Sequence, residues 1–172
     1  MKLRGLLIFA AVVYLSWLAM QAVHELGHVL AATVTGGSVV RVVLSPIAIS
    51  RTDVSPNPSP LAVAWGGPLV GVAIPVLITA AFRFRRRPAR SSDSPRQTGA
   101  SERATDLADF FAGFCLIANG VYIGVGSFDR VGDAGDLLRH GAPFWVLIAF
   151  GIVTIAGGLF CWHLALNRYR RR

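Results

Sequence analysis

Apolar residues in this chain form four long runs, separated by short polar or glycine-rich stretches. The runs cover about residues 5–33, 61–82, 107–125 and 143–166. A helix needs about 20 apolar residues to cross the hydrocarbon core of a bilayer, so the pattern predicts an all-α membrane protein with four transmembrane helices. A signal peptide is the alternative for the first run, which follows a basic start. The run continues well beyond a signal-peptide core, which favours a span.

The segment between the first two runs has the composition of β-strands. Residues 38–53 are rich in valine and isoleucine, and Pro46 stands in the middle as a turn or edge residue. We expect a short β-hairpin or a re-entrant strand segment here. It either fills the space between two helices or offers an edge that a substrate strand can extend.

The other stretches between the runs are predicted to be loops. Residues 83–106 contain seven arginines together with serine, proline and glutamine, which predicts a flexible basic linker. Residues 126–136 are rich in glycine and aspartate, which predicts a turn. No internal repeat is visible, and we expect residues 1–172 to form a single integral membrane domain.

Composition supports the membrane assignment and narrows the expected partners. The chain is 53% hydrophobic with a mean hydropathy of +0.55, which is too apolar for an ordinary soluble domain. Its net charge of +8 comes mainly from arginines that flank the apolar runs, so we expect a lipid bilayer and no nucleic acid as a partner. Cys115 and Cys161 lie inside apolar runs and indicate neither a disulfide framework nor a cysteine metal site.

Basic residues also predict the orientation of the chain. Thirteen of the 17 lysines and arginines fall near the N-terminus, in residues 83–106 or near the C-terminus. With four spans, these three regions lie on one side of the membrane. Because cytoplasmic loops carry an excess of lysine and arginine, both termini of this multi-pass protein are predicted to be cytoplasmic.

The candidate chemistry lies late in the first run, at His24-Glu25-Leu26-Gly27-His28. Two histidines four residues apart on a helix share one face, so both can bind one metal ion with Glu25 beside it. Three ionisable groups in a membrane-spanning segment are costly and indicate a functional site. These residue types fit a Zn²⁺ ion that assists peptide hydrolysis, and the predicted orientation puts the site toward the non-cytoplasmic face.

A catalytic zinc site needs a third protein ligand. The candidates on the same predicted face are Asp129, Asp133, Asp136 and His140. Asp133 and Asp136 are best placed, because the glycines around them let the backbone fold back toward the helices. Asp136 could equally be the N-cap of a helix that begins at Leu137. His140 and His163 lack a partner at ligand spacing, and we expect them to make local hydrogen bonds.

Three motifs together resemble the site-2 protease family of intramembrane zinc metalloproteases. The His-Glu-Leu-Gly-His motif is similar to the metal motif of that family. Residues 66–70 (Gly-Gly-Pro-Leu-Val) resemble its Gly-Pro-Leu element, and residues 133–138 (Asp-Ala-Gly-Asp-Leu-Leu) resemble its Asp-Gly element. The resemblance covers about residues 20–138 and includes the strand segment.

The resemblance implies a role for each candidate residue. His24, His28 and Asp133 would bind zinc, and Glu25 would activate a water molecule. Asn119 would orient the substrate or stabilise an oxyanion. Two departures from the family pattern are an alanine directly after Asp133 and a missing proline after Asn119. Asp136 therefore remains an alternative third ligand.

The expected function is hydrolysis of peptide bonds within or near the transmembrane segments of a membrane-protein substrate. In this mechanism Glu25 takes a proton from water and returns it to the leaving amine. A second hypothesis is a catalytically silent membrane protein on the same scaffold, with a structural zinc or a partner-binding role. A third is a transporter with a histidine–carboxylate relay, which four spans without a repeat make unattractive.

Overall fold

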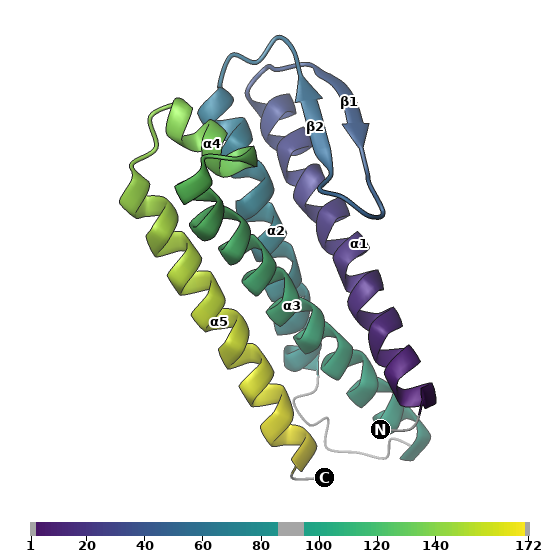
Figure 1. The fold of residues 1–172 in the computed structure, drawn as a ribbon. Helices are drawn as coiled ribbons and strands as arrows, with labels where there is room; N and C mark the ends of the chain where they lie inside the picture. The colour runs from purple at the N-terminus through teal and green to yellow at the C-terminus, as the bar shows by residue number, and fades with distance from the viewer. Residues whose placement is uncertain (1–2, 86–94, 171–172) are drawn as a thin grey trace.

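Long helices make up most of the molecule (Figure 1). The computed structural model describes residues 3–85 and 95–170. Within these residues the elements are α1 (Leu3–Val34), β1 (Val39–Val43), β2 (Arg51–Val54), α2 (Pro60–Arg85), α3 (Pro95–Asp129), α4 (Gly132–Arg139) and α5 (Phe144–Arg170). Helices α1, α2, α3 and α5 are each long and apolar enough to cross a membrane. The predicted all-α membrane fold is therefore confirmed for the described residues.

Glycines allow the long helices to pack closely. Helix α3 packs against both α2 and α5, and α1 packs against α2 (Figure 1). Where α1 crosses α2, a Cβ added to Gly66 would lie 2.5 Å from the carbonyl oxygen of Gly27. Where α3 crosses α5, a Cβ on Gly151 would lie 2.9 Å from the carbonyl oxygen of Gly120. Small residues at such crossings are typical of membrane helices, and the first crossing brings the histidine motif against α2.

The β-hairpin predicted after the first helix is present. Helix α1 ends where Gly36 adopts a positive φ of 77°, and the N–H of Gly37 donates to the carbonyl of Ala32 at 2.8 Å, a common glycine-dependent helix end. Strands β1 and β2 then pair in antiparallel register, with Val42 opposite Thr52. The chain thus turns back along the last part of α1.

Gln21 ties the loop between the two strands to α1. Its side-chain amide donates to the carbonyl of Ser45 at 2.9 Å, and its amide oxygen accepts the N–H of Ser50 at 2.7 Å. Gln21 is buried, so both polar ends of its side chain have partners, as buried amides require. This loop therefore has a fixed position beside the histidine motif.

The turn predicted over residues 126–136 is wrong over most of its length. Helix α3 continues to Asp129, and α4 begins at Gly132. The chain reverses between them at Arg130 and Gly132, whose φ angles are 54° and 53°. The rest is helical because α4 buries Leu137 against the bundle, and tertiary packing outweighs the turn preference of glycine and aspartate.

The flexible linker predicted over residues 83–106 is also too long. Helix α2 continues through Arg85 and α3 begins at Pro95, so only residues 86–94 of the predicted linker lie outside the described residues. Proline is favoured in the first turn of a helix, and residues 100–104 are mostly good helix formers. Arginine content alone does not distinguish a charged helix end from a linker.

A buried aspartate joins α3 to α2 and α5, through arginines near the C-terminal ends of those two helices. Asp109 of α3 is fully buried. Its carboxylate accepts hydrogen bonds from Arg83 of α2, at 2.6 Å, and from Arg168 of α5. The hairpin and α4 lie at the end of the bundle away from the start of α1 and the end of α5, beside the histidine motif (Figure 1).

Candidate metal centre

His24 and His28 lie one turn apart on α1, and both side chains are buried. The Nε2 atoms of both rings face the same oxygen, Oδ2 of Asp133 at the start of α4. The distances to this oxygen are 2.7 Å from His24 and 3.2 Å from His28. The structure thus brings together the two histidines and the first-ranked of the predicted third ligands.

The other nitrogen of each imidazole is held by a protein acceptor. Nδ1 of His24 lies 2.7 Å from Oδ1 of Asn119, whose Nδ2 donates to the carbonyl of Cys115. Nδ1 of His28 lies 2.7 Å from the carbonyl oxygen of Val63. Carbonyl and amide oxygens only accept hydrogen bonds, so both Nδ1 atoms carry the proton. In a neutral ring, this leaves each Nε2 with its lone pair directed at the common point.

This donor set fits a metal ion. Two imidazole lone pairs and a carboxylate oxygen converge, and the outward Nδ1–H groups have the acceptors that orient metal-binding histidines. Atoms that share a tetrahedral zinc ion at about 2.0–2.1 Å lie about 3.3 Å apart. The 3.2 Å separation from His28 matches that spacing, and the 2.7 Å separation from His24 requires a small opening.

The immediate surroundings also leave room for an ion. A Cβ added to Gly67 of α2 would lie 2.6 Å from Nε2 of His24 and would overlap Nε2 of His28. Glycine at this position therefore keeps any side chain of α2 out of the space in front of both nitrogens. Ligand atoms of His24, Glu25 and His28 all lie within 4.8 Å of one another, so this cluster of three residues could hold a metal ion.

Asp133 is held in the form that a metal ligand needs. Burial by itself raises the pKa of its carboxyl group, but His24 and His28, when protonated at Nε2, outweigh burial through their hydrogen bonds and charges. The pKa therefore lies well below its ordinary value, and the carboxylate is ionised at neutral pH. The backbone N–H of Asp133 also donates to the hydroxyl of Tyr122 at 3.3 Å, which helps to fix the start of α4.

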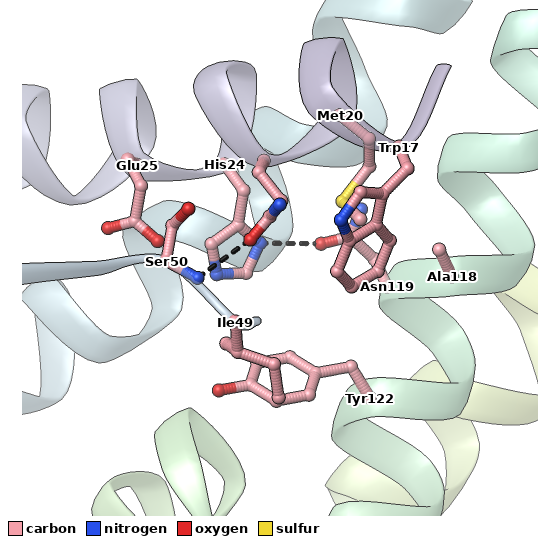
Figure 2. A pocket seen from close by; sticks show the side chains of 10 residues that line it. Trp17, Met20, His24, Glu25, Ile49, Ser50, Ala118, Asn119 and Tyr122 are labelled. Carbon is pink, nitrogen blue, oxygen red and sulfur yellow. Dashed lines mark hydrogen bonds between the residues drawn. The ribbon is translucent and has the colours of Figure 1, made fainter. Parts of the chain in front are cut away.

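Glu25 lies on the hairpin side of the two histidines. Its side chain is 3% exposed, and its Oε2 accepts a hydrogen bond from the hydroxyl of Thr52 on β2 at 2.7 Å. Figure 2 shows Glu25 beside His24 at the edge of a cavity. A carboxylate at this position can act on a water molecule that approaches the histidines.

The other predicted aspartates lie elsewhere. Asp136 is inside α4 and pairs with Arg139 at the surface. Its predicted role as a helix N-cap is wrong, because α4 begins at Gly132, a full turn before it. Asp129 is exposed at the end of α3. Among these candidates, the contacts with the histidines belong to Asp133.

The remaining histidines have separate surroundings. His163 of α5 is hydrogen-bonded to Asn167, whose side-chain amide lies 2.8 Å from its Nε2, which confirms the predicted local hydrogen bond. His140 follows the last residue of α4 and lines a polar cavity of about 640 Å³. His140 is exposed, and its expected local hydrogen bond stays a prediction.

Asn119 reaches His24 from α3. Its amide oxygen accepts a hydrogen bond from Nδ1 of His24. This contact is that of a residue that orients a metal-binding histidine. The predicted contact with substrate stays a prediction. Tyr122, three residues later on the same face of α3, lines the cavities on both sides of the cluster. Sequence reasoning missed Tyr122 and Thr52, although the spacing from Asn119 could have indicated the tyrosine.

Two cavities of different character meet at the cluster. The larger, about 640 Å³, lies among the hairpin, α1, α2 and α4, and charged residues such as Arg51 and Asp136 line it. The smaller, about 80 Å³, lies between α1 and α3 and is mainly apolar. Glu25 and Tyr122 line both, so these two side chains stand between a polar and an apolar compartment.

No protein-family model, curated protein or solved structure matches the chain. Its likeness to site-2 proteases consists of the three sequence motifs.

Proposed function

We propose that this chain is an intramembrane zinc metalloprotease of the site-2 protease type, with His24, His28 and Asp133 as zinc ligands. One observation carries the proposal. Both Nδ1 atoms are occupied by acceptors, while both Nε2 atoms face one carboxylate oxygen. Two neutral imidazoles and a carboxylate repel one another in this arrangement, so a positive charge must lie among them, either a metal ion or a proton on one Nε2. Imidazole nitrogen and carboxylate oxygen are common donors to zinc.

Glu25 is the general base in this proposal. When bound, Zn²⁺ supplies Lewis acidity that polarises a substrate carbonyl and makes a water molecule easier to deprotonate. Glu25 accepts the proton as the water oxygen bonds to the carbonyl carbon and the π electrons move to the carbonyl oxygen. It then donates that proton to the amide nitrogen as the C–N bond breaks.

Tyr122 supplies a hydrogen-bond donor to the developing oxyanion. Its hydroxyl oxygen accepts the N–H of Asp133, so the hydroxyl hydrogen can point toward the cluster. A donor aimed at developing negative charge in a water-poor site lowers the reaction barrier. In this proposal Tyr122 takes the oxyanion role that the sequence motifs suggested for Asn119.

The substrate in this proposal is a membrane-protein segment in extended form. A peptide bond inside a helix has its carbonyl engaged by an N–H four residues later, so the segment must unwind before cleavage. In this proposal, water reaches the cluster through the polar cavity of about 640 Å³ on one side of it. The substrate segment approaches from the bilayer along the apolar span α1.

A structural zinc on a silent scaffold is the second candidate. It is favoured by one observation, the inclusion of Glu25 in the group whose ligand atoms lie within 4.8 Å. With Asp133, four protein ligands would then close the site, as in structural zinc centres. The hydrogen bond that Thr52 donates to Glu25 supports the catalytic alternative, because it gives one Glu25 oxygen a partner other than an ion.

Cleavage of a single-pass reporter by purified protein in liposomes tests the proposal. We expect zinc-dependent cleavage that a chelator abolishes and that added zinc restores. Glu25→Gln should retain zinc and lose cleavage, because the amide accepts no proton. Glu102→Gln is the matched control, since it makes the same change at the other glutamate of the chain, and it should cleave normally.

The two candidates give different outcomes in this assay. Chelator-sensitive cleavage lost in Glu25→Gln supports the protease. Tight zinc binding without cleavage of any reporter would support the silent scaffold instead. Cleavage that survives in Glu25→Gln would remove Glu25 as the base.

A further inference from the structure

The smaller cavity, about 80 Å³, lies directly beside His24 and Glu25 of the candidate metal centre (Figure 2). Trp17 and Met20 of α1 line it on one side, at two turns and one turn before His24, and Ala118 of α3 lines it on the other. Ile49, from the loop between the strands, closes it toward the hairpin. The cavity therefore extends from the cluster toward the middle of α1, deeper into the apolar part of the bundle.

His24 and Glu25 belong to both the cluster and this cavity. A substrate carbonyl at the cluster thus places an adjoining side chain at the cavity mouth, since successive residues of an extended chain are about 3.3 Å apart. We infer that the cavity is a specificity subsite that takes one small aliphatic side chain, alanine or valine in size, next to the scissile bond. This inference rests on the proposed protease function.

The chemistry of the walls selects an apolar side chain. Apart from the catalytic groups and the indole N–H of Trp17, the polar side chains that line the cavity already have partners. Gln21 is bonded to the loop between the strands, Ser50 accepts the N–H of Ser45, and Asn119 is bonded to His24 and Cys115. The remaining lining surface is mainly the apolar faces of Trp17 and Met20 and their neighbours. A polar substrate side chain would exchange its water for few free hydrogen-bond partners, which is costly.

The size of the cavity selects a small side chain. A protein cavity of about 150 Å³ is large enough to bind benzene. The present cavity is about half that size, at about 80 Å³, so a methyl or isopropyl group fits and an aromatic ring does not. Met20 is buried and Ala118 faces the cavity from α3, so these two residues limit its width from opposite walls.

A set of single-pass reporters, identical except at the residues flanking the cleaved bond, tests the subsite. The flanking positions carry alanine, valine or phenylalanine, and mass spectrometry identifies the bond that is cut. At one flanking position, wild type should favour alanine and valine over phenylalanine by about tenfold or more in kcat/KM, the discrimination typical of a close-fitting pocket.

Two variants change the cavity in opposite directions. Ala118→Leu adds three carbons to the wall and should lower kcat/KM for valine relative to alanine by about tenfold. Met20→Ala widens the cavity and should raise kcat/KM for phenylalanine relative to alanine by a similar factor. Ala19→Leu is the matched control, because Ala19 is exposed on α1 outside the cavity, and its ratios should equal those of wild type.

The outcomes separate this inference from the function on which it rests. Wild-type cleavage without side-chain preference, or ratios unchanged in both cavity variants, overturns the subsite and leaves the protease intact. The subsite is also overturned if Ala118→Leu lowers kcat/KM equally for all reporters and Met20→Ala does not raise kcat/KM for the phenylalanine reporter. If zinc-loaded wild type cleaves no reporter at all, the proposed function fails and the subsite fails with it.

Discussion

At the residue scale, the two histidines differ in what holds them in place. His28 is oriented by a backbone carbonyl, that of Val63, which no side-chain substitution removes. His24 is oriented by a side chain, the amide of Asn119. The first contact depends only on the packing of α1 against α2, whereas the second can be removed by changing one residue.

Asn119→Ala should therefore weaken zinc binding without abolishing it. Loss of a partner that orients a metal-binding histidine typically costs 10–100-fold in metal affinity, and we expect a loss in that range. Competition with a chromogenic chelator measures it. Asn167→Ala, which removes the partner of His163, is the matched control. Equal zinc affinity in Asn119→Ala and wild type would contradict the orienting role.

Tyr122→Phe should slow the chemical step while leaving zinc in place. Removing one oxyanion donor costs about 10²–10³ in kcat, so we expect a fall of that order with a nearly unchanged KM and normal zinc content. Tyr14→Phe, an exposed tyrosine on α1, controls for the loss of a phenol hydroxyl. A kcat like that of wild type would exclude Tyr122 as the donor.

The sequence indicated some residues of the site and not others, for a physical reason. The spacing of His24 and His28 is a local property of one helix, so it is visible in the sequence. The contacts of Thr52 and Tyr122 depend on how a hairpin and a third helix pack against the first. Asn119 was singled out, but its role depends on which neighbour its amide faces, and only the folded chain defines that.

At the element scale, the short helix α4 decides which aspartate meets the histidines. Its first turn carries Asp133 inward, while Asp136, three residues later, pairs with Arg139 at the surface. Leu137 is fully buried and anchors the helix to the bundle. The sequence predicted a turn here because glycine and aspartate occur in turns as well as at helix starts.

The buried Asp109 should be the more costly of two Asp–Arg pairings to remove. Asp109→Asn leaves Arg83 and Arg168 without a carboxylate between them. Breaking a buried ion pair costs about 3–5 kcal/mol, and we expect about 2–3 kcal/mol in the free energy of unfolding because both arginines reach water. Reversible unfolding in mixed micelles measures this loss.

Asp136→Asn is the control for that measurement. Its pair with Arg139 is exposed, and exposed ion pairs contribute about 0–1 kcal/mol. Equal losses in the two variants would show that Asp109 does not hold the three helices together. The comparison depends on stability alone and needs no assay of cleavage.

At the scale of the whole molecule, the two ends of the bundle differ. One end carries the start of α1 and the end of α5, while the other carries the hairpin and α4 (Figure 1). Asp109 binds arginines near the C-terminal ends of α2 and α5, and the candidate metal centre adjoins α4 through Asp133. Hydropathy predicted the four spans and the hairpin well, because each depends on local composition. It could not predict which helices are neighbours, since that depends on glycine contacts between distant segments.

The distribution of arginine predicts that the termini face the cytoplasm and the metal centre faces the other side. Single cysteines at Leu3, at the start of α1, and at Ile47, in the exposed loop between the strands, test this in intact cells. They are introduced into a chain whose own Cys115 and Cys161 are replaced by alanine. A membrane-impermeant maleimide should label Ile47→Cys from outside, and should label Leu3→Cys only after the cells are opened. The reverse pattern would place the site toward the cytoplasm.

The zinc content of purified protein, compared among wild type, Asp133→Ala and Asp136→Ala, tests the candidate metal centre most directly. Because Asp133 alone of these two aspartates meets both histidines, we expect about one zinc per chain in wild type and in Asp136→Ala. We expect Asp133→Ala to lose most of it. Full zinc occupancy in Asp133→Ala, or a wild type that binds none, would contradict the proposed centre.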